Sequence, residues 1–296
     1  MAIWNLGSIN LDLVYSLSHF PAAGETLAAQ AFHRYLGGKG ANMSVAGARA
    51  GATVHHIGAV GTDGAEMVGK LTDTGVKTDH IAKVPVATGH AVISVVAGTD
   101  GDAGENQIIL FPGANQTLTK AQVAQALDGA KAGDIFVTQN ETNMQVEACR
   151  MAAEKGLRVC YAAAPFDADA VAAVLPYLDF LILNEVEAAQ LAEATGQQPE
   201  ALGVRDVIIT LGSKGARHID CTTGQTHDVK AFRVEPVDTT GAGDTFTGYV
   251  LAGLDQGQSM AEAMETANRA GAVMVTRHGT SDVIPTLAEV NAADLT

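Results

Sequence analysis

A glycine-rich turn and an aspartate stand at the start of a long apolar segment in the last fifth of the chain. Residues 238–244 read DTTGAGD, and the pattern of residues 242–256 predicts a helix. Free N–H groups at a helix N-terminus bind anions, which makes Gly241–Gly243 a candidate anion hole for a phosphoryl group. Asp244 would lie beside that anion, where a carboxylate can accept the proton of an attacking hydroxyl. A plain turn, with Asp244 as an N-terminal helix charge, explains these residues alone equally well.

Two further segments combine glycine with side chains that suit a polyol. Residues 37–42 read GGKGAN before an alanine-rich segment, and residues 7–12 read GSINLD after the first apolar run. Lys39 could meet a phosphate, and Asn42 carries the donors and the acceptor that sugar hydroxyls need. Asp12 could bind two adjacent hydroxyls through its two carboxylate oxygens. The alternatives are a capped flexible loop and a solvated turn carboxylate.

Two strand ends carry residues that suit a nucleotide and its magnesium ion. Asn184 and Glu187 follow the apolar run 180–183 one helical turn apart, so they share a face and could order Mg²⁺ waters. Asn184 could equally be a helix N-cap. The small residues in 210–215, which read TLGSKG, suit a nucleotide lying flat against the backbone, and Lys214 could reach its phosphates. A simple β-turn explains that segment as well.

The elements that must position these residues alternate between short apolar runs and amphipathic segments. Such alternation predicts βαβ units and a mostly parallel sheet covered by helices on both faces, which is a three-layer α/β fold. The predicted strands are residues 3–9, 53–60, 134–139, 158–164, 180–184 and 206–211, and the predicted helices are residues 41–50, 65–75, 121–130, 144–155, 185–194, 242–256 and 260–277.

Two stretches, about 11–36 and 87–111, interrupt this alternation. Their apolar and polar residues follow a period of two rather than a helical period. We interpret them as strands of a small second sheet inserted into a single α/β domain that spans residues 1–296. A small sheet above the C-terminal edge of a parallel sheet is well placed to act as a lid. Because lid strands with apolar faces often pair, we also expect a homodimer through this sheet.

Composition and charge limit the class of protein. Hydrophobic residues make up 47% of the 296 residues, which is enough for a large core. The formal net charge of −15 argues against nucleic-acid binding but not against a nucleotide held by a few local cations. The three cysteines show no C-x-x-C spacing, and neither a signal peptide nor a membrane-spanning run is evident. We therefore expect a cytoplasmic enzyme with no nucleic-acid or membrane partner.

The motifs converge on one known family. The runs GSINLD, GGKGAN, N-x-x-E, TLGSKG and DTTGAGDTF stand in the order and relative positions of the ribokinase-like, or phosphofructokinase-B, carbohydrate kinases, and this chain resembles that family over nearly its whole length. The resemblance implies a ribokinase-like core with a β-sheet lid. It also implies ATP-dependent phosphorylation of a sugar hydroxyl, with Mg²⁺ bound to ATP and a monovalent cation, K⁺, beside the anion hole.

The resemblance also implies a role for individual residues. Asp244 is the expected base, and the backbone of Gly241, Ala242 and Gly243 is the expected anion hole. The expected sugar site consists of Asn10, Asp12, Gly38, Lys39, Asn42, Glu141 and Asp244. The expected nucleotide and Mg²⁺ site consists of Asn184, Glu187, Thr210, Gly212, Lys214, Gly215, Gly243 and Asn268. The monovalent-cation loop is expected at Asp238, Thr240, Arg277 and Gly279.

The sequences of residues 7–12 and 37–42 most resemble those of the family members that phosphorylate free D-ribose to ribose 5-phosphate. Residues 162–165 depart from the family pattern, because they read AAAP where an Asn-Pro-Ala-Pro run is usual. A nucleoside kinase of the same family is the first alternative, although it would need an apolar slot for a base, and only 5% of this chain is aromatic. A non-catalytic sugar or nucleotide sensor is the second alternative.

Overall fold

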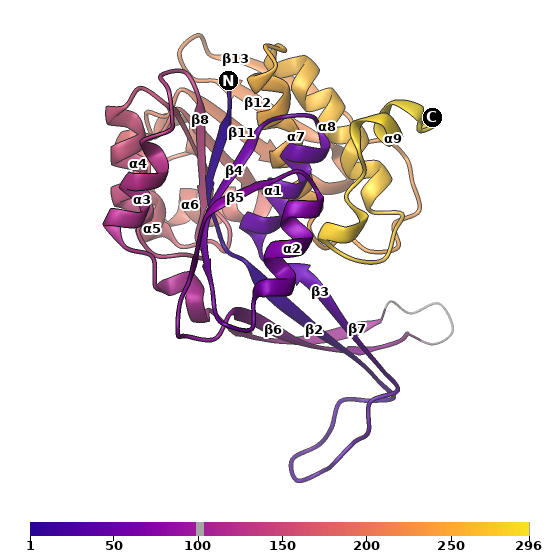
Figure 1. Ribbon diagram of the computed structural model, residues 1–296. Coiled ribbons are helices and arrows are strands. Elements are labelled where there is room, and N and C mark those ends of the chain that lie inside the picture. The colour runs from indigo at the N-terminus through magenta and orange to yellow at the C-terminus, as the bar shows by residue number, and fades with distance from the viewer. Residues whose placement is uncertain (99–103, 296) are drawn as a thin grey trace.

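A large, mostly parallel sheet forms the centre of the molecule. In the computed structural model, which describes residues 1–98 and 104–295, this sheet has nine strands in the order β13-β12-β11-β10-β9-β8-β1-β4-β5 (Figure 1). Neighbouring strands from β5 to β11 are parallel, and β12 and β13 add an antiparallel edge. The strands are β1 (Ile3–Leu6), β4 (Val54–Val60), β5 (Lys77–Lys83), β8 (Ile135–Gln139), β9 (Arg158–Ala162), β10 (Phe180–Asn184), β11 (Asp206–Thr210), β12 (Ala216–Asp220) and β13 (Gln225–Val229).

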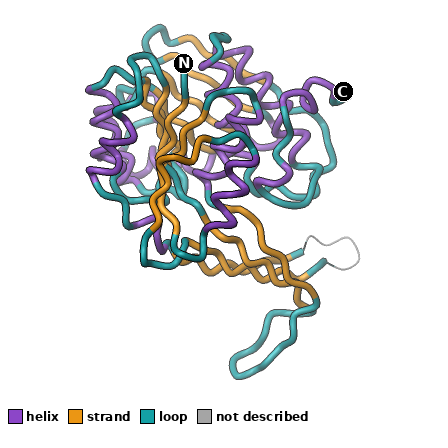
Figure 2. The backbone as a smooth tube through the Cα atoms, viewed as in Figure 1, coloured by secondary structure: helices purple, strands orange, loops and turns teal. Residues whose placement is uncertain are grey.

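Helices cover both faces of this sheet (Figure 2). One face packs against α1 (Lys39–Arg49), α2 (Ala65–Asp73), α7 (Ala242–Asp255), α8 (Met260–Met274) and α9 (Leu287–Ala292). The other packs against α3 (Lys120–Leu127), α4 (Gln145–Glu154), α5 (Ala168–Val174) and α6 (Glu185–Thr195). Successive side chains of a strand point to opposite faces of the sheet, so each strand contributes to the hydrophobic core on both faces. In β9, Cys160 packs on the face covered by α1 and α7, whereas Val159 and Tyr161 pack on the face covered by α3 to α6. The predicted three-layer α/β class is confirmed.

Local sequence fixes where many of these helices begin. Four of them start with a capping box, in which the N-cap side chain and the side chain three residues later each bond the other's backbone N–H. This reciprocal pairing satisfies donors that the first turn leaves without an intrahelical partner. The four pairs are Thr119 and Gln122 for α3, Asn184 and Glu187 for α6, Ser259 and Glu262 for α8, and Thr286 and Glu289 for α9.

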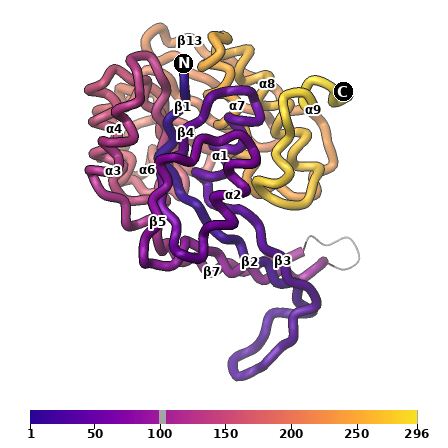
Figure 3. Tube along the Cα trace, viewed as in Figure 1, coloured from indigo at the N-terminus to yellow at the C-terminus, as the bar shows by residue number. Residues whose placement is uncertain are grey.

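A second, smaller sheet projects from the main body (Figures 1 and 3). Its strands β2 (Asn10–Leu17), β3 (Ala31–Gly37), β6 (Gly89–Val96) and β7 (Glu105–Phe111) lie in the order β3-β2-β6-β7. The central β2–β6 pair is parallel, and the two outer pairs are antiparallel. The small inserted sheet was predicted within residues 11–36 and 87–111, of which residues 99–103 lie outside the described residues.

Several element boundaries differ from the prediction, and β5, β12, β13, α5 and α9 were not predicted at all. The strand expected over residues 3–9 ends at Leu6, because the chain bends at Gly7 to pass close to α1. A side chain at Gly7 would lie 2.5 Å from the Cα atom of Gly40. The helix expected over residues 260–277 ends at Met274. None of the helices within the described ranges is long and apolar enough to cross a membrane.

Candidate active site

The motifs that the sequence singled out meet at one edge of the large sheet. Asn184 is the last residue of β10 and lies opposite Thr210, the last residue of β11. The turn after β1 and the turn after β8 leave the same edge, because these two strands are parallel and adjacent. The C-terminal ends of parallel strands are where open α/β sheets bind ligands. The fold therefore brings three of the five motifs together at strand ends, and the N-termini of α1 and α7 bring the other two.

The N-terminus of α7 is shaped to receive a ligand. Gly241 is the N-cap residue, and its φ of +78° is a left-handed conformation that glycine adopts without strain. Gly243 follows in the first turn, where backbone N–H groups have no intrahelical acceptor. Nothing in the described protein lies within 4 Å of the place that a side chain at Gly243 would take. The protein's own packing therefore does not require a glycine there, whereas close approach of a ligand to the backbone would.

Asp244 is buried in this first turn, with 7% of its surface exposed. Its Oδ2 atom accepts a hydrogen bond of 2.9 Å from Nδ2 of Asn42 on α1. Burial raises the pKa of Asp244, while the charge of Lys39 and the Asn42 hydrogen bond oppose the rise. The same Asp244 charge is the main cause that raises the pKa of Lys39. A carboxylate in this position is a stronger proton acceptor than an exposed one and is oriented by Asn42.

Glu141 connects the turn after β1 to the start of α1. Its Oε2 atom accepts a hydrogen bond from Oγ of Ser8 and another, of 3.0 Å, from the backbone N–H of Lys39. Oγ of Ser8 in turn accepts a hydrogen bond from the N–H of Gly40, at 3.2 Å. The two glycine-containing segments and Glu141 therefore form one connected wall of the site.

Asp12 lies on β2, where the small sheet joins the main body. Burial, with a smaller contribution from the charge of Glu141, raises its pKa to about 7. Its carboxylate lies directly over Gly37, since a side chain there would come within 2.1 Å of Oδ2. Asn10, two residues earlier, uses its Oδ1 atom to accept a 2.7 Å hydrogen bond from Nδ2 of Asn115. The side-chain oxygen of Asn10 is thus already engaged by Asn115, whereas the carboxylate oxygens of Asp12 can accept hydrogen bonds from a ligand.

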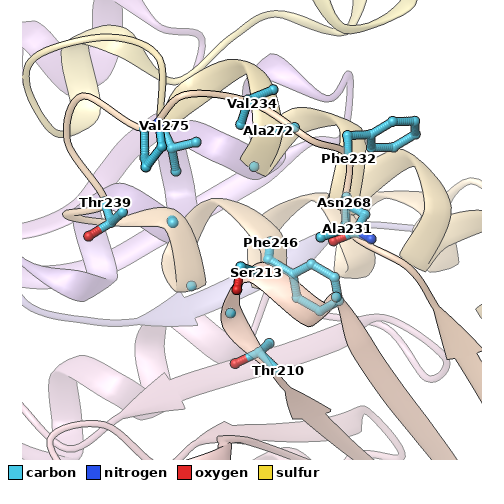
Figure 4. A pocket seen from close by; sticks show the side chains of 17 residues that line it. Thr210, Ser213, Ala231, Phe232, Val234, Thr239, Phe246, Asn268, Ala272 and Val275 are labelled. Atoms are coloured by element: carbon cyan, nitrogen blue, oxygen red, sulfur yellow. The ribbon is translucent and has the colours of Figure 1, made fainter. Parts of the chain in front are cut away.

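Two cavities meet at the N-terminus of α7. The first has a volume of about 310 Å³ and is walled mainly by apolar and small residues (Figure 4). The figure shows Thr210 and Ser213 at one end of it and Val234, Ala272 and Val275 at the other. Its lining is Thr210, Gly212, Ser213, Gly215, Ala231, Phe232, Val234, Pro236, Thr239, Ala242, Gly243, Phe246, Ala267, Asn268, Gly271, Ala272 and Val275.

The second cavity, of about 200 Å³, contains the charged groups. Its lining is Lys39, Met43, Ala162, Ala163, Ala164, Ile182, Leu183, Asn184, Glu187, Thr210, Gly241, Gly243, Asp244 and Thr247. Thr210 and Gly243 line both cavities, so the two spaces adjoin at the start of α7. An elongated molecule in the first cavity would thus place one end beside Asp244 and Lys39.

Not every residue predicted for the nucleotide site faces these cavities. Lys214 lines neither of the two; its Nζ atom lies 3.2 Å from the Glu185 carboxylate, and 69% of its side chain is exposed. Asn184 and Glu187 line the second cavity, but they also form the capping box of α6, so the N-cap alternative is observed as well. One oxygen of Glu187 accepts the N–H of Asn184, which leaves the other for a ligand.

The segments predicted to hold a monovalent cation are in contact. The carboxylate of Asp238 accepts hydrogen bonds from the N–H groups of Thr240, at 2.9 Å, and of Gly279, at 3.3 Å. The guanidinium of Arg277 donates to the carbonyl of Val283 and to Glu289. Because a guanidinium is positively charged and has no acceptor, Arg277 could bind a cation only through its backbone carbonyl. Backbone carbonyls are the donors that K⁺ prefers, and this donor set fits such an ion.

Sequence reasoning missed the wall of the first cavity. Residues 231–236 lie between β13 and α7 and have no periodic pattern, so nothing in the sequence marks them as a wall. Three small residues of α8, Ala267, Gly271 and Ala272, also line the cavity. Ser8 was also missed, although it stands within a motif that was recognised.

Two solved structures with this architecture are named as kinases of small molecules. The ribokinase of Arabidopsis thaliana, solved as a complex with ribose and ATP, is 26% identical with a TM-score of 0.85, and the match covers 99% of this chain and 98% of that one. A nucleoside kinase of Burkholderia thailandensis, solved with inosine, is 21% identical with a TM-score of 0.83 over 98% of this chain and 97% of that one. At that identity the second match shows likeness of fold alone.

The family follows from the sequence comparison. A family model described as pfkB family carbohydrate kinase matches residues 3–287. The ribokinase of Haemophilus influenzae is 36% identical over 301 residues, which cover 96% of this chain and 95% of that protein. The chain therefore belongs to the pfkB family of carbohydrate kinases, which makes it an ATP-dependent sugar kinase.

Proposed function

We propose that the protein transfers the γ-phosphoryl group of ATP to the 5-hydroxyl of D-ribose, with Asp244 as the general base. The observation that carries this proposal is the buried Asp244 carboxylate in the lining of the second cavity, one residue after Gly243, which lines both cavities. Relatives that match nearly the whole chain and bear the name ribokinase support ribose as the acceptor.

In this proposal the acceptor sugar lies between Asp12, Lys39, Asn42 and Asp244, with Gly38 and Glu141 completing the wall. Asp244 accepts the proton of the attacking hydroxyl while Asn42 holds the carboxylate in place. The N–H groups of the α7 turn and the ammonium of Lys39 stabilise the charge on the transferred phosphoryl group. Because such transition states are loose, most of the rate comes from positioning and charge stabilisation.

The nucleotide is assigned to the first cavity, with its phosphates directed toward α7. Apolar walls and the half-buried Asn268 suit a base and ribose, and the small residues of the turn 210–215 suit close backbone contact. The Mg²⁺ ion that accompanies ATP would be held through water by Asn184 and Glu187, whose oxygen atoms are hard ligands. The pKa of Glu187 is raised by burial, which the charge of Lys39 opposes and a bound cation would oppose further.

A substitution in α8 tests this assignment. Gly271 lines the first cavity, and nothing in the described protein lies within 4 Å of the place that its side chain would take. We expect Gly271→Leu to fill the cavity and raise the KM for ATP about 10- to 100-fold, a cost typical of forced overpacking, with the sugar KM within about twofold. Gly69→Leu on α2 is the matched control, because that glycine also faces open space. Equal ATP KM values in both variants would contradict the assignment.

The monovalent cation is assigned to two neighbouring segments, the loop before α7, which contains Asp238 and Thr240, and the loop after α8, which contains Arg277 and Gly279. The carbonyl groups of Thr240, Arg277 and Gly279, together with Asp238, would hold K⁺ there. When bound, the ion supplies fixed positive charge next to the anion hole. Asp238 itself already joins the two segments by its hydrogen bonds, so this chain's own contribution is to keep the turn before α7 in place.

The small sheet is proposed to act as a lid and as the dimer interface. All of β7 is exposed, including Ile108, Ile109, Leu110 and Phe111. Four consecutive large apolar residues on an exposed edge strand mark an interaction surface. Closure of the sheet over Asp12 would exclude water and so limit wasteful hydrolysis of ATP.

We expect sedimentation to give the mass of two chains for the unmodified protein and of one chain for Ile109→Asp. Ile109 is 72% exposed, so the substitution places a charge on the proposed interface without disturbing the core. Val146→Asp on α4 is the control, since that exposed apolar residue lies away from the small sheet. An unmodified protein that sediments as one chain would overturn the dimer proposal.

Release of ADP with Mg·ATP and K⁺ across a panel of free sugars and nucleosides tests the proposed acceptor. D-ribose should give the highest kcat/KM. Turnover with nucleosides alone would favour the nucleoside-kinase alternative. Binding of sugar and ATP without turnover would favour the sensor alternative.

A further inference from the structure

Four polar side chains are buried together beneath the sugar-binding wall. Asn5 of β1, Ser44 of α1, His56 of β4 and Gln139 of β8 come from four different elements, and each is at most 1% exposed. We call these four residues the Asn5 cluster. Apolar residues of similar size would fill this space without the cost of removing polar groups from water. A buried polar cluster with matched partners instead fixes a single geometry.

The hydrogen bonds of His56 have only one possible direction. Its Nε2 atom lies 3.1 Å from the carbonyl oxygen of Gly7, which can only accept, so Nε2 carries the proton. Burial lowers the pKa of His56 to about 4, so the ring is neutral and its Nδ1 atom is an acceptor. The hydroxyl of Ser44, 2.8 Å away, must therefore donate to Nδ1.

The hydrogen bonds of Asn5 also have a defined direction. Because the Ser44 hydroxyl donates to His56, its oxygen is free to accept the 2.8 Å hydrogen bond from Nδ2 of Asn5. The second N–H of that amide donates to the carbonyl of Gly40, also at 2.8 Å. Its Oδ1 atom accepts a 2.9 Å hydrogen bond from Gln139. Each donor in the chain from Gln139 to His56 thus has a matching acceptor, whereas the Oε1 atom of Gln139 has no hydrogen-bond partner among the described residues.

The cluster ends on the backbone carbonyls of Gly7 and Gly40, two glycines that pack against each other. A side chain at Gly40 would come within 2.4 Å of the Cα atom of Gly7, so the two segments touch through their glycines. The neighbours of these glycines form the wall of the sugar site. Ser8 follows Gly7, Lys39 precedes Gly40, and both donate to the carboxylate of Glu141.

We propose that His56, acting through Ser44 and Asn5, is a positioning residue that fixes the Gly7–Gly40 contact and thereby sets the affinity for the acceptor sugar. This inference rests on the proposed sugar kinase function. His56 does not touch the substrate. The first cavity is built from residues of β11, the turn after it, α7, α8 and the loop before α7. None of these residues belongs to the cluster, so nucleotide affinity should not depend on it.

The test compares His56→Phe with His55→Phe. Phenylalanine keeps the ring volume at residue 56 but removes the hydrogen bonds to Gly7 and Ser44. We expect the KM for D-ribose to rise about tenfold, the scale of one or two lost buried hydrogen bonds, while the KM for ATP stays within about twofold. His55 is the matched control, because it lies next in β4 but faces the opposite side of the sheet and stacks on Trp4.

Two further variants separate positioning from stability. Ser44→Ala removes only the central link and should raise the sugar KM in the same way, with less disturbance of packing. The double variant His56→Phe/Ser44→Ala exchanges one donor without an acceptor, the Ser44 hydroxyl, for another, an N–H of Asn5, so its thermal stability should be close to that of His56→Phe. A sugar KM that stays raised in both variants, at a temperature where thermal unfolding shows them to be fully folded, supports positioning. A sugar KM that returns to the unmodified value would overturn it.

Hydrogen exchange gives a readout that does not require turnover. In His56→Phe, amides of residues 7–12 and 37–42 should exchange faster than in the unmodified protein, and those of residues 210–215 and 241–247 should not change. Unchanged exchange in residues 7–12 and 37–42 would contradict the positioning role of His56 even if the protein phosphorylates ribose. Faster exchange there, with no sugar turnover in the unmodified protein, would uphold the positioning role and refute the proposed function instead.

Discussion

Asp244→Asn should lower kcat by a factor of about 10² to 10⁴ while the protein stays folded and still binds both substrates. This is the range usually lost when a general base is removed. Asparagine keeps the size of the side chain and can still pair with Asn42, so the geometry of the α7 turn should survive. It cannot take up the proton of the attacking hydroxyl. The KM values for sugar and ATP should therefore change much less than kcat.

Asp255→Asn is the matched control for this prediction. Asp255 is the last residue of the same helix, is also buried, and has a pKa that burial raises in the same direction. It lies far from both cavities, so its substitution tests the cost of the same chemical change without touching the site. A kcat for Asp244→Asn within threefold of the Asp255→Asn value would remove Asp244 from the role of base.

Asp12→Ala should raise the KM for the sugar and lower kcat/KM by about 10- to 100-fold. Hydrogen bonds to a charged group contribute about 1.5–3 kcal/mol each, and about 1.4 kcal/mol corresponds to a factor of ten. The carboxylate lies over Gly37, outside the nucleotide cavity, so the KM for ATP should stay within about twofold. An unchanged sugar KM would place the acceptor elsewhere.

The raised pKa of Asp12 adds a pH dependence with a definite sign. With its pKa near 7, Asp12 is mostly protonated below that value and mostly ionised above it. Only the ionised form offers acceptors on both oxygens, so kcat/KM for the sugar should fall as the pH drops through about 7. Asp12→Asn should lose that inflection, because an amide does not titrate in this range. The same inflection in both proteins would assign it to another group.

Much of the fold could be predicted because local patterns agree with it. The apolar runs that became β8 to β11 alternate with amphipathic segments, and capping residues such as Asn184 and Ser259 mark where helices begin. The edge hairpin β12–β13 was missed because its strands, ARHID and QTHDV, are short and polar. A strand at the edge of a sheet buries little, so its sequence carries a weak signal.

The candidate site, like the fold, could be predicted only in part from the sequence. Glycine-rich turns at helix starts are visible in sequence, and the structure brings the turn at Gly241 next to Asn42, some two hundred residues earlier in the chain. The Asn5 cluster was not visible, because its members are single polar residues within apolar runs. His56 stands in the run predicted as the strand 53–60 and belongs to none of the five motifs. Its hydrogen bonds to Ser44 and Gly7 depend on tertiary contacts that no local pattern reports.

Phosphorus NMR of a single reaction mixture, with Mg·ATP, K⁺ and D-ribose, tests the central claim most directly. The account predicts that the γ-phosphate signal of ATP is replaced, mole for mole, by the signal of a sugar phosphate ester on the 5-hydroxyl, and that Asp244→Asn slows this exchange at least a hundredfold. Formation of inorganic phosphate without an ester, or an ester formed equally fast by Asp244→Asn, would contradict it.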